Sequence, residues 1–174
     1  TADDEGRMVY VQDEEKVYYG DGTAWVEFAN ADSEVSSSME LSITSMSNQT
    51  AVGTKTDVTV GENVSFGELL YLKADGKYWK SDADASTTMP AEVMAIATIL
   101  ADAVGQVLVM GFARDTSWSW TLGNGIANLL YATTTAGDIS QTAPSGSGDQ
   151  VQVIGYAHES DITMFSPQLG LLEI

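Results

Sequence analysis

Leu69-Leu70-Tyr71, the turn Asp75-Gly76 and the apolar run Val93-Met94-Ala95-Ile96-Ala97 form a pattern that this chain contains twice. Sixty positions later the pattern reads Leu129-Leu130-Tyr131, then Ala136-Gly137, then Val153-Ile154-Gly155-Tyr156-Ala157. The offset is 60 both at the tyrosines (131 − 71) and at the final alanines (157 − 97). A fixed offset of this kind indicates that one supersecondary unit was duplicated.

Each copy of the pattern ends in a further apolar run, Gln106–Phe112 in the first copy and Asp161–Phe165 in the second. The chain therefore predicts a unit of four short strands, made twice. The two repeats cover about residues 61–115 and 121–167 of a domain that spans 61–174. A single unit of this size exposes an apolar face, and two units that face each other bury it.

Turn signals recur about every 8–12 residues between these runs, which favours an all-β barrel or sandwich. For residues 91–104 a helix is the competing interpretation, because Ala, Glu, Met and Leu are good helix formers. We prefer strands there, because the corresponding residues 151–157 of the second copy have a far less helical composition.

The first 34 residues predict a small β-meander. Three runs rich in β-branched and aromatic residues are separated by polar turns: Met8–Val11, Lys16–Tyr19 and Thr23–Phe28. So small a sheet has too little core to stand alone, and we expect it to pack on a partner or to trimerise. Residues 35–60 are interpreted as a linker with short strands, and residues 48–56 within it have the composition of a loop. When extended, this linker is long enough to reach a neighbouring subunit.

The charge balance limits the choice of partners. The chain has 7 basic and 25 acidic residues among 174, a net charge of −18. This argues against nucleic acid and anionic membrane surfaces, because both need clustered Lys and Arg. It fits a surface protein that stays dispersed in solution. The chain has no cysteine, which excludes disulfides and thiolate metal sites, and it has no apolar run of the ~18 residues that a membrane-spanning helix needs.

No residue pattern predicts catalysis, a cofactor or a metal site. His158 is the only histidine, and its position at a strand end beside Glu159 is typical of a surface or interface residue. The acidic clusters 3–5, 13–15 and 82–84 lack the spacing of an EF-hand loop and are better explained as solvated turns and tails, although a metal shared between subunits stays open. Among 25 acidic residues, some pair of carboxylates lies close together by chance. We therefore expect a protein that is not an enzyme.

Aromatic and aliphatic side chains are the remaining candidates for binding. Trp118 and Trp120 are two positions apart, so on a strand they share one face. They suit stacking on a sugar ring or anchoring an interface, and the alternative is that they cover the end of the barrel. The apolar C-terminal tail either tucks into the core or docks on a partner. The predicted interface residues are Trp25, Phe28, Trp118, Trp120, Leu171 and Leu172.

Six segments of the chain share a pattern with a known group of proteins. They are Gly105–Asp115, Leu129–Tyr131 with Thr133–Gly137, Gln141–Asp149, Val153–Ala157, Met8–Val11 and Tyr18–Val26. The segments from Gly105 to Ala157 resemble a module of tailed-phage virion proteins, which occurs in head decoration or head-fibre proteins and in tail-fibre-like proteins. Met8–Val11 and Tyr18–Val26 are similar to the short meander that is common in phage fibre and head proteins. The resemblance is weakest over residues 35–60. It rests on turn and strand patterns, so it carries over no catalytic residue.

The resemblance implies a homotrimeric structural protein on the outer surface of the virion. In the leading hypothesis it decorates the head by binding the major capsid protein, and the mechanism is burial of surface without chemistry. In the alternative hypothesis it is a tail-fibre or receptor-binding module that recognises host surface glycans through exposed aromatic side chains.

Overall fold

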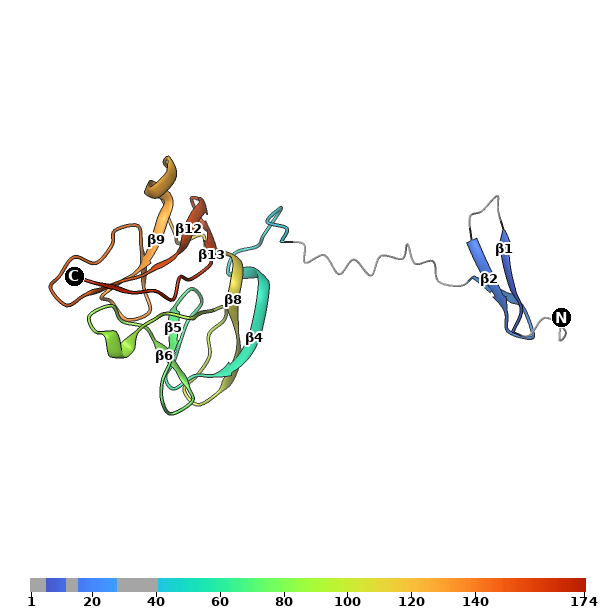
Figure 1. The fold of residues 1–174 in the computed structure, drawn as a ribbon, viewed down its shortest axis with the longest axis horizontal. Helices are drawn as coiled ribbons and strands as arrows, with labels where there is room; N and C mark the ends of the chain where they lie inside the picture. Colours follow the sequence, from blue (N-terminus) through green and yellow to red (C-terminus); the bar gives the residue numbers. More distant parts are fainter. Residues whose placement is uncertain (1–5, 12–15, 28–40) are drawn as a thin grey trace. The chain divides into compact units, whose positions relative to one another are not determined.

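In the computed structural model the chain divides into two units, residues 1–40 and residues 41–174. The structure describes residues 6–11, 16–27 and 41–174. We call the first unit the meander and the second the body, and each is considered by itself (Figure 1). Apart from two short 3-10 helices, the regular structure of the described residues is β-strand, so the predicted all-β fold is confirmed.

The meander is a three-stranded antiparallel sheet in the order β1-β2-β3. Its strands are β1 (Met8–Val11), β2 (Lys16–Gly20) and β3 (Trp25–Glu27). The Asp21 carboxylate holds the turn between β2 and β3. Its Oδ1 accepts hydrogen bonds from the backbone N–H groups of Thr23 at 2.8 Å and Ala24 at 2.7 Å. The meander predicted from the sequence is thus present.

The body contains the remaining elements. They are β4 (Thr50–Thr59), β5 (Leu69–Leu72), β6 (Tyr78–Lys80), η1 (Ser86–Thr88), β7 (Val93–Ala95), β8 (Val104–Arg114), η2 (Gly125–Asn128), β9 (Leu129–Ala132), β10 (Ile139–Ser140), β11 (Gln150–Val151), β12 (Val153–Glu159), β13 (Ile162–Phe165) and β14 (Leu172–Glu173). Residues 91–104 contain the strand β7, a connection and the first residue of β8 but no helix, which agrees with the preferred interpretation.

The duplication predicted from the sequence is visible in the strand pairing. Copy one pairs its strands in the order β6-β5-β7-β8, and copy two in the same order, β10-β9-β12-β13. The last strands of the two copies, β8 and β13, pair antiparallel with each other. The sheet order β10-β9-β12-β13-β8-β7-β5-β6 therefore reads the same for both copies outward from the β13–β8 pair, and β4 pairs with β8 outside this order.

The sheet buries apolar side chains on both faces, which we call inner and outer. The first core cluster lies on the inner face and draws on both copies: Ala51, Leu69, Ala83, Met89, Ala91, Met94, Leu108, Ala113, Leu130, Ala132, Ile154, Ala157 and Phe165. The second core cluster lies on the outer face and comes from β4 and copy one: Val58, Val60, Val64, Leu70, Val93, Ala95, Ile99 and Val107. Successive residues of β5, β7 and β8 alternate between the clusters, which explains their continuous apolar runs.

The segment expected to be a linker contributes a central element of the body. β4 pairs with β8 over ten residue pairs, from Thr50 with Arg114 to Thr59 with Val104. Local composition favours a loop over 48–56, but five alternate positions between 50 and 58 are Thr or Val, which suit a pleated sheet. Long-range pairing with β8 settles the conformation, so the body begins at residue 41 and not at 61.

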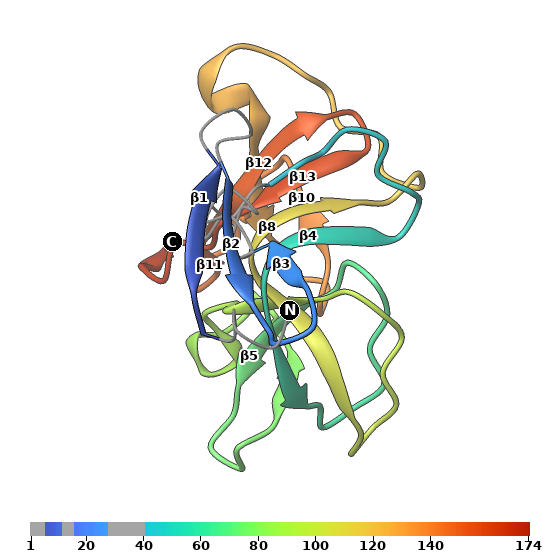
Figure 2. The ribbon, with the colours of Figure 1, turned by 90° about the vertical axis from the view of Figure 1, so that its right-hand side faces the viewer.

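The sheet of the body curls on itself as a half-barrel (Figure 2). Its edge strand β6 returns to the end of β4, where Gly61 N donates a hydrogen bond to the Tyr78 carbonyl at 2.9 Å. Beyond the main sheet, β11 and β14 form a two-stranded pair that ties the C-terminal tail to the body.

Candidate functional site

The meander carries apolar side chains on both of its faces. From the strand register, one face presents Met8, Tyr10, Val17, Tyr19 and Val26. The opposite face presents Val9, Val11, Tyr18 and Trp25, which line a shallow hollow of about 400 Å³. Within the described part of this unit no hydrophobic side chain is fully buried, and Met8 and Tyr10 are about 60% exposed (62% and 59%). The described strands of the meander therefore have no core on either face.

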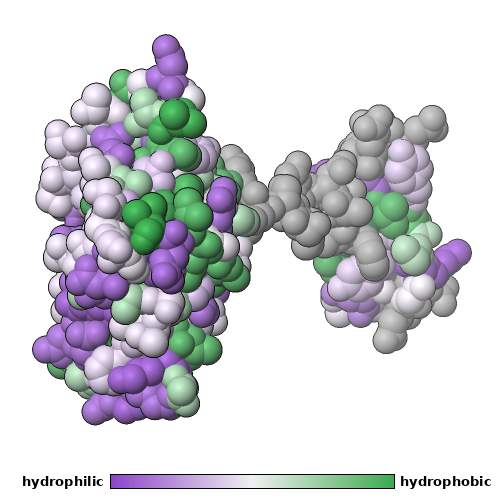
Figure 3. Space-filling model, turned by 60° about the vertical axis from the view of Figure 1, so that its left-hand side comes forward, coloured by the Kyte–Doolittle hydropathy of each residue, from purple (hydrophilic) through white to green (hydrophobic). Residues whose placement is uncertain are grey.

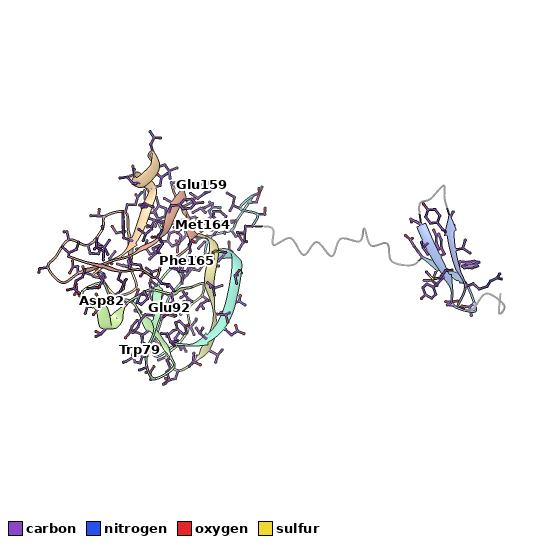
Figure 4. The ribbon with its side chains drawn as sticks, in the orientation of Figure 1. Trp79, Asp82, Glu92, Glu159, Met164 and Phe165 are labelled. Carbon is purple, nitrogen blue, oxygen red and sulfur yellow. The ribbon has the colours of Figure 1, made fainter. Side chains whose placement is uncertain are left out.

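A second apolar surface lies on the outer face of the body. One side chain from each of five neighbouring strands lines up across the sheet, as the register shows: Leu129 (β9), Tyr156 (β12), Met164 (β13), Phe112 (β8) and Val52 (β4). We call these five residues the outer row. Figure 2 shows β12, β13, β8 and β4 side by side, and Figure 4 labels Met164 next to its buried neighbour Phe165.

The outer row remains accessible to solvent. Tyr156 is 42% exposed, and the other four side chains are partly exposed. His158 lies beside the row, with its ring edge-on to Phe112 at a centroid distance of 5.2 Å and 6.5 Å from Tyr156. Figure 3 shows hydrophobic residues gathered over one part of the visible face of the body, with polar residues around them.

A polar cleft of about 380 Å³ lies where three distant segments of the body meet. It is lined by residues 65–68, by 115, 117 and 118, and by 137–139. Trp118 forms its aromatic wall, with ring centroids 6.2 Å from Phe66 and 5.6 Å from Trp120. Trp120 Nε1 donates a hydrogen bond to Thr163 Oγ1 at 3.1 Å. The two tryptophans lie in the connection after β8 and pack against the first core cluster.

Asp115 is the buried carboxylate of this cleft, with 6% of its surface exposed. Its Oδ1 accepts a hydrogen bond from Ser117 N at 2.8 Å, and its Oδ2 accepts one from Gln49 Nε2 at 3.3 Å. Burial acts to raise the pKa of Asp115, but the hydrogen bonds from Ser117 and Gln49 together outweigh it and hold the pKa below its ordinary value. The carboxylate is therefore charged at neutral pH and fastens residue 49 to the wall of the cleft.

The ionisation of Asp115 gives a testable pH dependence. Because its pKa is lower in the folded chain than in the unfolded chain, its charge stabilises the fold above the unfolded pKa of about 4, and this contribution is lost as the pH falls through the lower folded pKa. At pH 7 the variant Asp115→Asn is expected to unfold with ~1–2 kcal/mol less free energy than the wild type, since it loses charge-assisted hydrogen bonds.

In urea titrations at several pH values, the difference between the wild type and Asp115→Asn should shrink as the pH falls below about 4. A difference that stays constant between pH 7 and pH 3 would contradict this role. Asp84→Asn is a matched control, since Asp84 is exposed, and its effect should be small at every pH.

The predicted interface residues that the structure describes differ in their exposure. Trp25 is 43% exposed in the meander, and Phe28 lies outside the described residues. Trp118, Trp120 and Leu171 are partly buried and pack against the first core cluster. Leu172 is 64% exposed on β14.

Sequence reasoning missed the outer row. Its members are spread over five strands, and only the register of a folded sheet brings them together. A partial signal exists in copy two, where Tyr156 and Met164 interrupt runs of small or aliphatic residues. The missed cleft depends in the same way on segments about 50 and 70 positions apart in the sequence.

Metal and membrane features can be assessed for the described residues only. Among them, no group of three or more His, Cys, Asp or Glu side chains is arranged to hold a metal ion. The acidic clusters at 3–5 and 13–15 lie outside the described residues. No helix in the described part of the chain is long and apolar enough to span a membrane.

Comparisons of the chain with protein-family models, with curated proteins and with solved structures give no match.

Proposed function

We propose that this chain is a structural protein of a tailed-phage virion, which decorates the outer surface of the head as a homotrimer and binds the major capsid protein. The observation that supports this proposal is a small sheet with apolar side chains on both faces, joined to a body that has two core clusters of its own. An arm of this kind gains stability when its faces are buried against a partner.

The mechanism is burial without chemistry. The meander seats on the shell with Trp25 as its anchor, since tryptophan is enriched among residues that dominate binding energy. A standard interface buries roughly 1,600 Å² in total. The net charge of −18 keeps the decorated particles apart. Repeated over many capsid sites, such contacts strengthen the shell.

The test is binding to shells that have been stripped of the protein. The full chain is expected to bind at saturable sites, and the body alone (residues 41–174) is expected not to bind. Because both core clusters lie within 41–174, the body keeps its fold without the meander. Trp25→Ser should weaken binding at least tenfold, while Leu100→Ser, which replaces a 64% exposed leucine of the body, should leave it unchanged. If the body alone saturates shells as the full chain does, the meander is not the shell-binding arm.

The alternative proposal is a receptor-binding module for host surface glycans, and the cleft beside Trp118 favours it. Sugar sites commonly combine an aromatic wall with carboxylates and hydroxyl groups, and this cleft has Trp118 together with Asp115 and Ser117. A glycan array probed with the full chain tests this. Binding that is lost in Trp118→Ala and kept in Trp25→Ser would support the alternative, and an array without any bound glycan would rule it out.

A further inference from the structure

The two copies of the duplicated unit differ in what covers their outer faces. Over copy one, the outer face is closed by the chain's own connections, residues 60–64 and 96–103. Val64 and Ile99 lie in these connections and exchange two backbone hydrogen bonds of 2.9 Å. Val60 and Val64 have no exposed surface, and Ile99 is 5% exposed. Copy one thus carries its own aliphatic cover.

Within the described residues of the body, copy two has no such cover. Its strands β12 and β13 are joined directly by a turn at residues 160–161, in place of the longer connection 96–103 between β7 and β8. The segment that precedes β9 is exposed from residue 121 to residue 127, and Ile126 within it is 83% exposed. The outer row therefore remains partly exposed, on the same outer face of the sheet that the two connections cover over copy one.

The outer row is continuous with the covered part of the outer face. Along β8, Val107 is buried in the second core cluster, Met110 is 38% exposed and Phe112 belongs to the outer row. Next to Met110 is a hollow of about 400 Å³ whose apolar lining includes Val93 and Leu169. The row itself crosses four strand spacings of ~4.8 Å, so it is about 20 Å wide. Exposed apolar patches of this extent commonly mark contact sites.

The charge of the surface points to the occupant. The five side chains of the row are uncharged, and the nearest ion pair, Arg114 Nε with Asp161 Oδ2 at 2.8 Å, is neutral as a whole. Elsewhere the chain is strongly acidic, with a net charge of −18. Two copies of the chain repel each other electrostatically over most of their surface. The electrostatic cost of association is lowest where they meet through an uncharged face. A basic partner would be drawn to the acidic surface instead.

We infer that the outer row is the contact surface through which bodies of neighbouring copies of this chain associate. In this arrangement a second copy supplies the aliphatic cover that copy two lacks, as the connections 60–64 and 96–103 supply it to copy one. The inference deepens the proposed homotrimer and so rests on the proposed function, but it concerns contacts between copies and not contacts with the shell.

The experiment measures solution mass by light scattering, without shells, for the body alone and for the full chain of 18.5 kDa. For both proteins we expect a mass that is a multiple of the mass of the single polypeptide. Tyr156→Glu and Met164→Glu each place a negative charge in the row and should shift the body to the monomer mass, with at least a tenfold loss of association. Ile126→Glu, at an exposed apolar residue outside the row, should leave the mass unchanged. Circular dichroism shows whether each variant is folded.

A wild-type body that stays monomeric while the full chain associates would overturn the inference, because the meander then holds the copies together. The inference would also be overturned if the body is monomeric and the Tyr156→Glu variant of the full chain no longer binds shells. In that case the outer row is the surface that binds the capsid protein. Association that depends on the row, in a full chain that ignores shells, would support the inference and count against the proposed function. The mass measurement therefore tests the contact between copies, and the shell-binding measurement tests the proposed function, so either one can be contradicted without the other.

Discussion

Replacing Gly111 by alanine is expected to lower the free energy of unfolding of the body by about 3 kcal/mol or more, because it combines backbone strain with a collision. Gly111 has φ +146°, a conformation that side-chain-bearing residues rarely adopt. A Cβ at this position would lie 2.1 Å from the Val52 carbonyl oxygen and 2.7 Å from the Cα of Gly53. Both are backbone atoms of the paired strand β4, so no side chain can move aside to make room.

The matched control is Gly76→Ala. Gly76 also has a positive φ, +80°, but a Cβ there meets nothing within 4 Å. It is expected to cost about 1 kcal/mol, from the backbone conformation alone. Urea unfolding followed by tryptophan fluorescence measures both variants. If Gly111→Ala were no more destabilising than Gly76→Ala, the close approach of β4 and β8 would not matter for stability.

Gly111 is one of three glycines that shape the sheet. Gly53, Gly111 and Gly155 have φ values of 146°, 146° and 144°, and each would place a Cβ within 2.2 Å of a carbonyl oxygen on a neighbouring strand. Phe165, which is fully buried, pairs with Gly111 on one side and Gly155 on the other. Glycines in a line across a sheet allow it to bend sharply. They account for the curl that separates the inner from the outer face.

The duplication can be predicted from the sequence because it is marked by local sequence signals. The tyrosines at 71 and 131 and the turns at 75–76 and 136–137 mark the same hairpin in both copies, and the structure shows β5 with β6 and β9 with β10 there. Alternation and turn chemistry act within a few residues, so they can be read without the fold. How the copies pair with each other is not local, and no sequence feature predicted that β8 pairs with β13.

Features that depend on distant partners were predicted poorly. Residues 48–56 suit a loop by composition, and only pairing with β8 makes them part of β4. The spacing of Trp118 and Trp120 was interpreted for a strand, but the two residues lie in a connection, where their ring centroids are 5.6 Å apart. The cleft at Asp115 and the outer row are both assembled from separate segments.

The second large effect on the free energy of unfolding is expected for Gln152→Leu. Gln152 makes a polar contact between the two copies of the duplicated unit. Gln152 has no exposed surface. Its Oε1 accepts a hydrogen bond from Ala91 N, and its Nε2 donates to the carbonyl oxygens of Ala91 and Gln168, all at 2.8 Å. One side chain thus joins copy two to copy one and to the C-terminal tail.

Leucine at position 152 has a similar size but leaves the buried N–H and carbonyl groups of Ala91 without partners. An unpaired buried polar group costs ~1–3 kcal/mol, so Gln152→Leu is expected to lower the free energy of unfolding by about 3–4 kcal/mol. Gln106→Leu, at an exposed position of β8, is the control and should change it by less than about 0.5 kcal/mol. Equal effects of the two substitutions in urea unfolding would show that the hydrogen bonds of Gln152 contribute little.

Gln152→Glu distinguishes the loss of hydrogen bonds from the loss of shape. Above its pKa the glutamate keeps the acceptor for Ala91 N, but it faces two carbonyl oxygens without a donor and carries a charge in a buried site. Burial raises the pKa of such a carboxyl group in the folded chain, so the penalty is present above the unfolded pKa of about 4.3 and disappears as the pH falls below it. The stability of Gln152→Glu relative to wild type is therefore expected to improve between pH 7 and pH 4, whereas that of Gln152→Leu is expected to stay constant. Parallel pH profiles of the two variants would mean that packing, and not hydrogen bonding to Ala91, is what Gln152 provides.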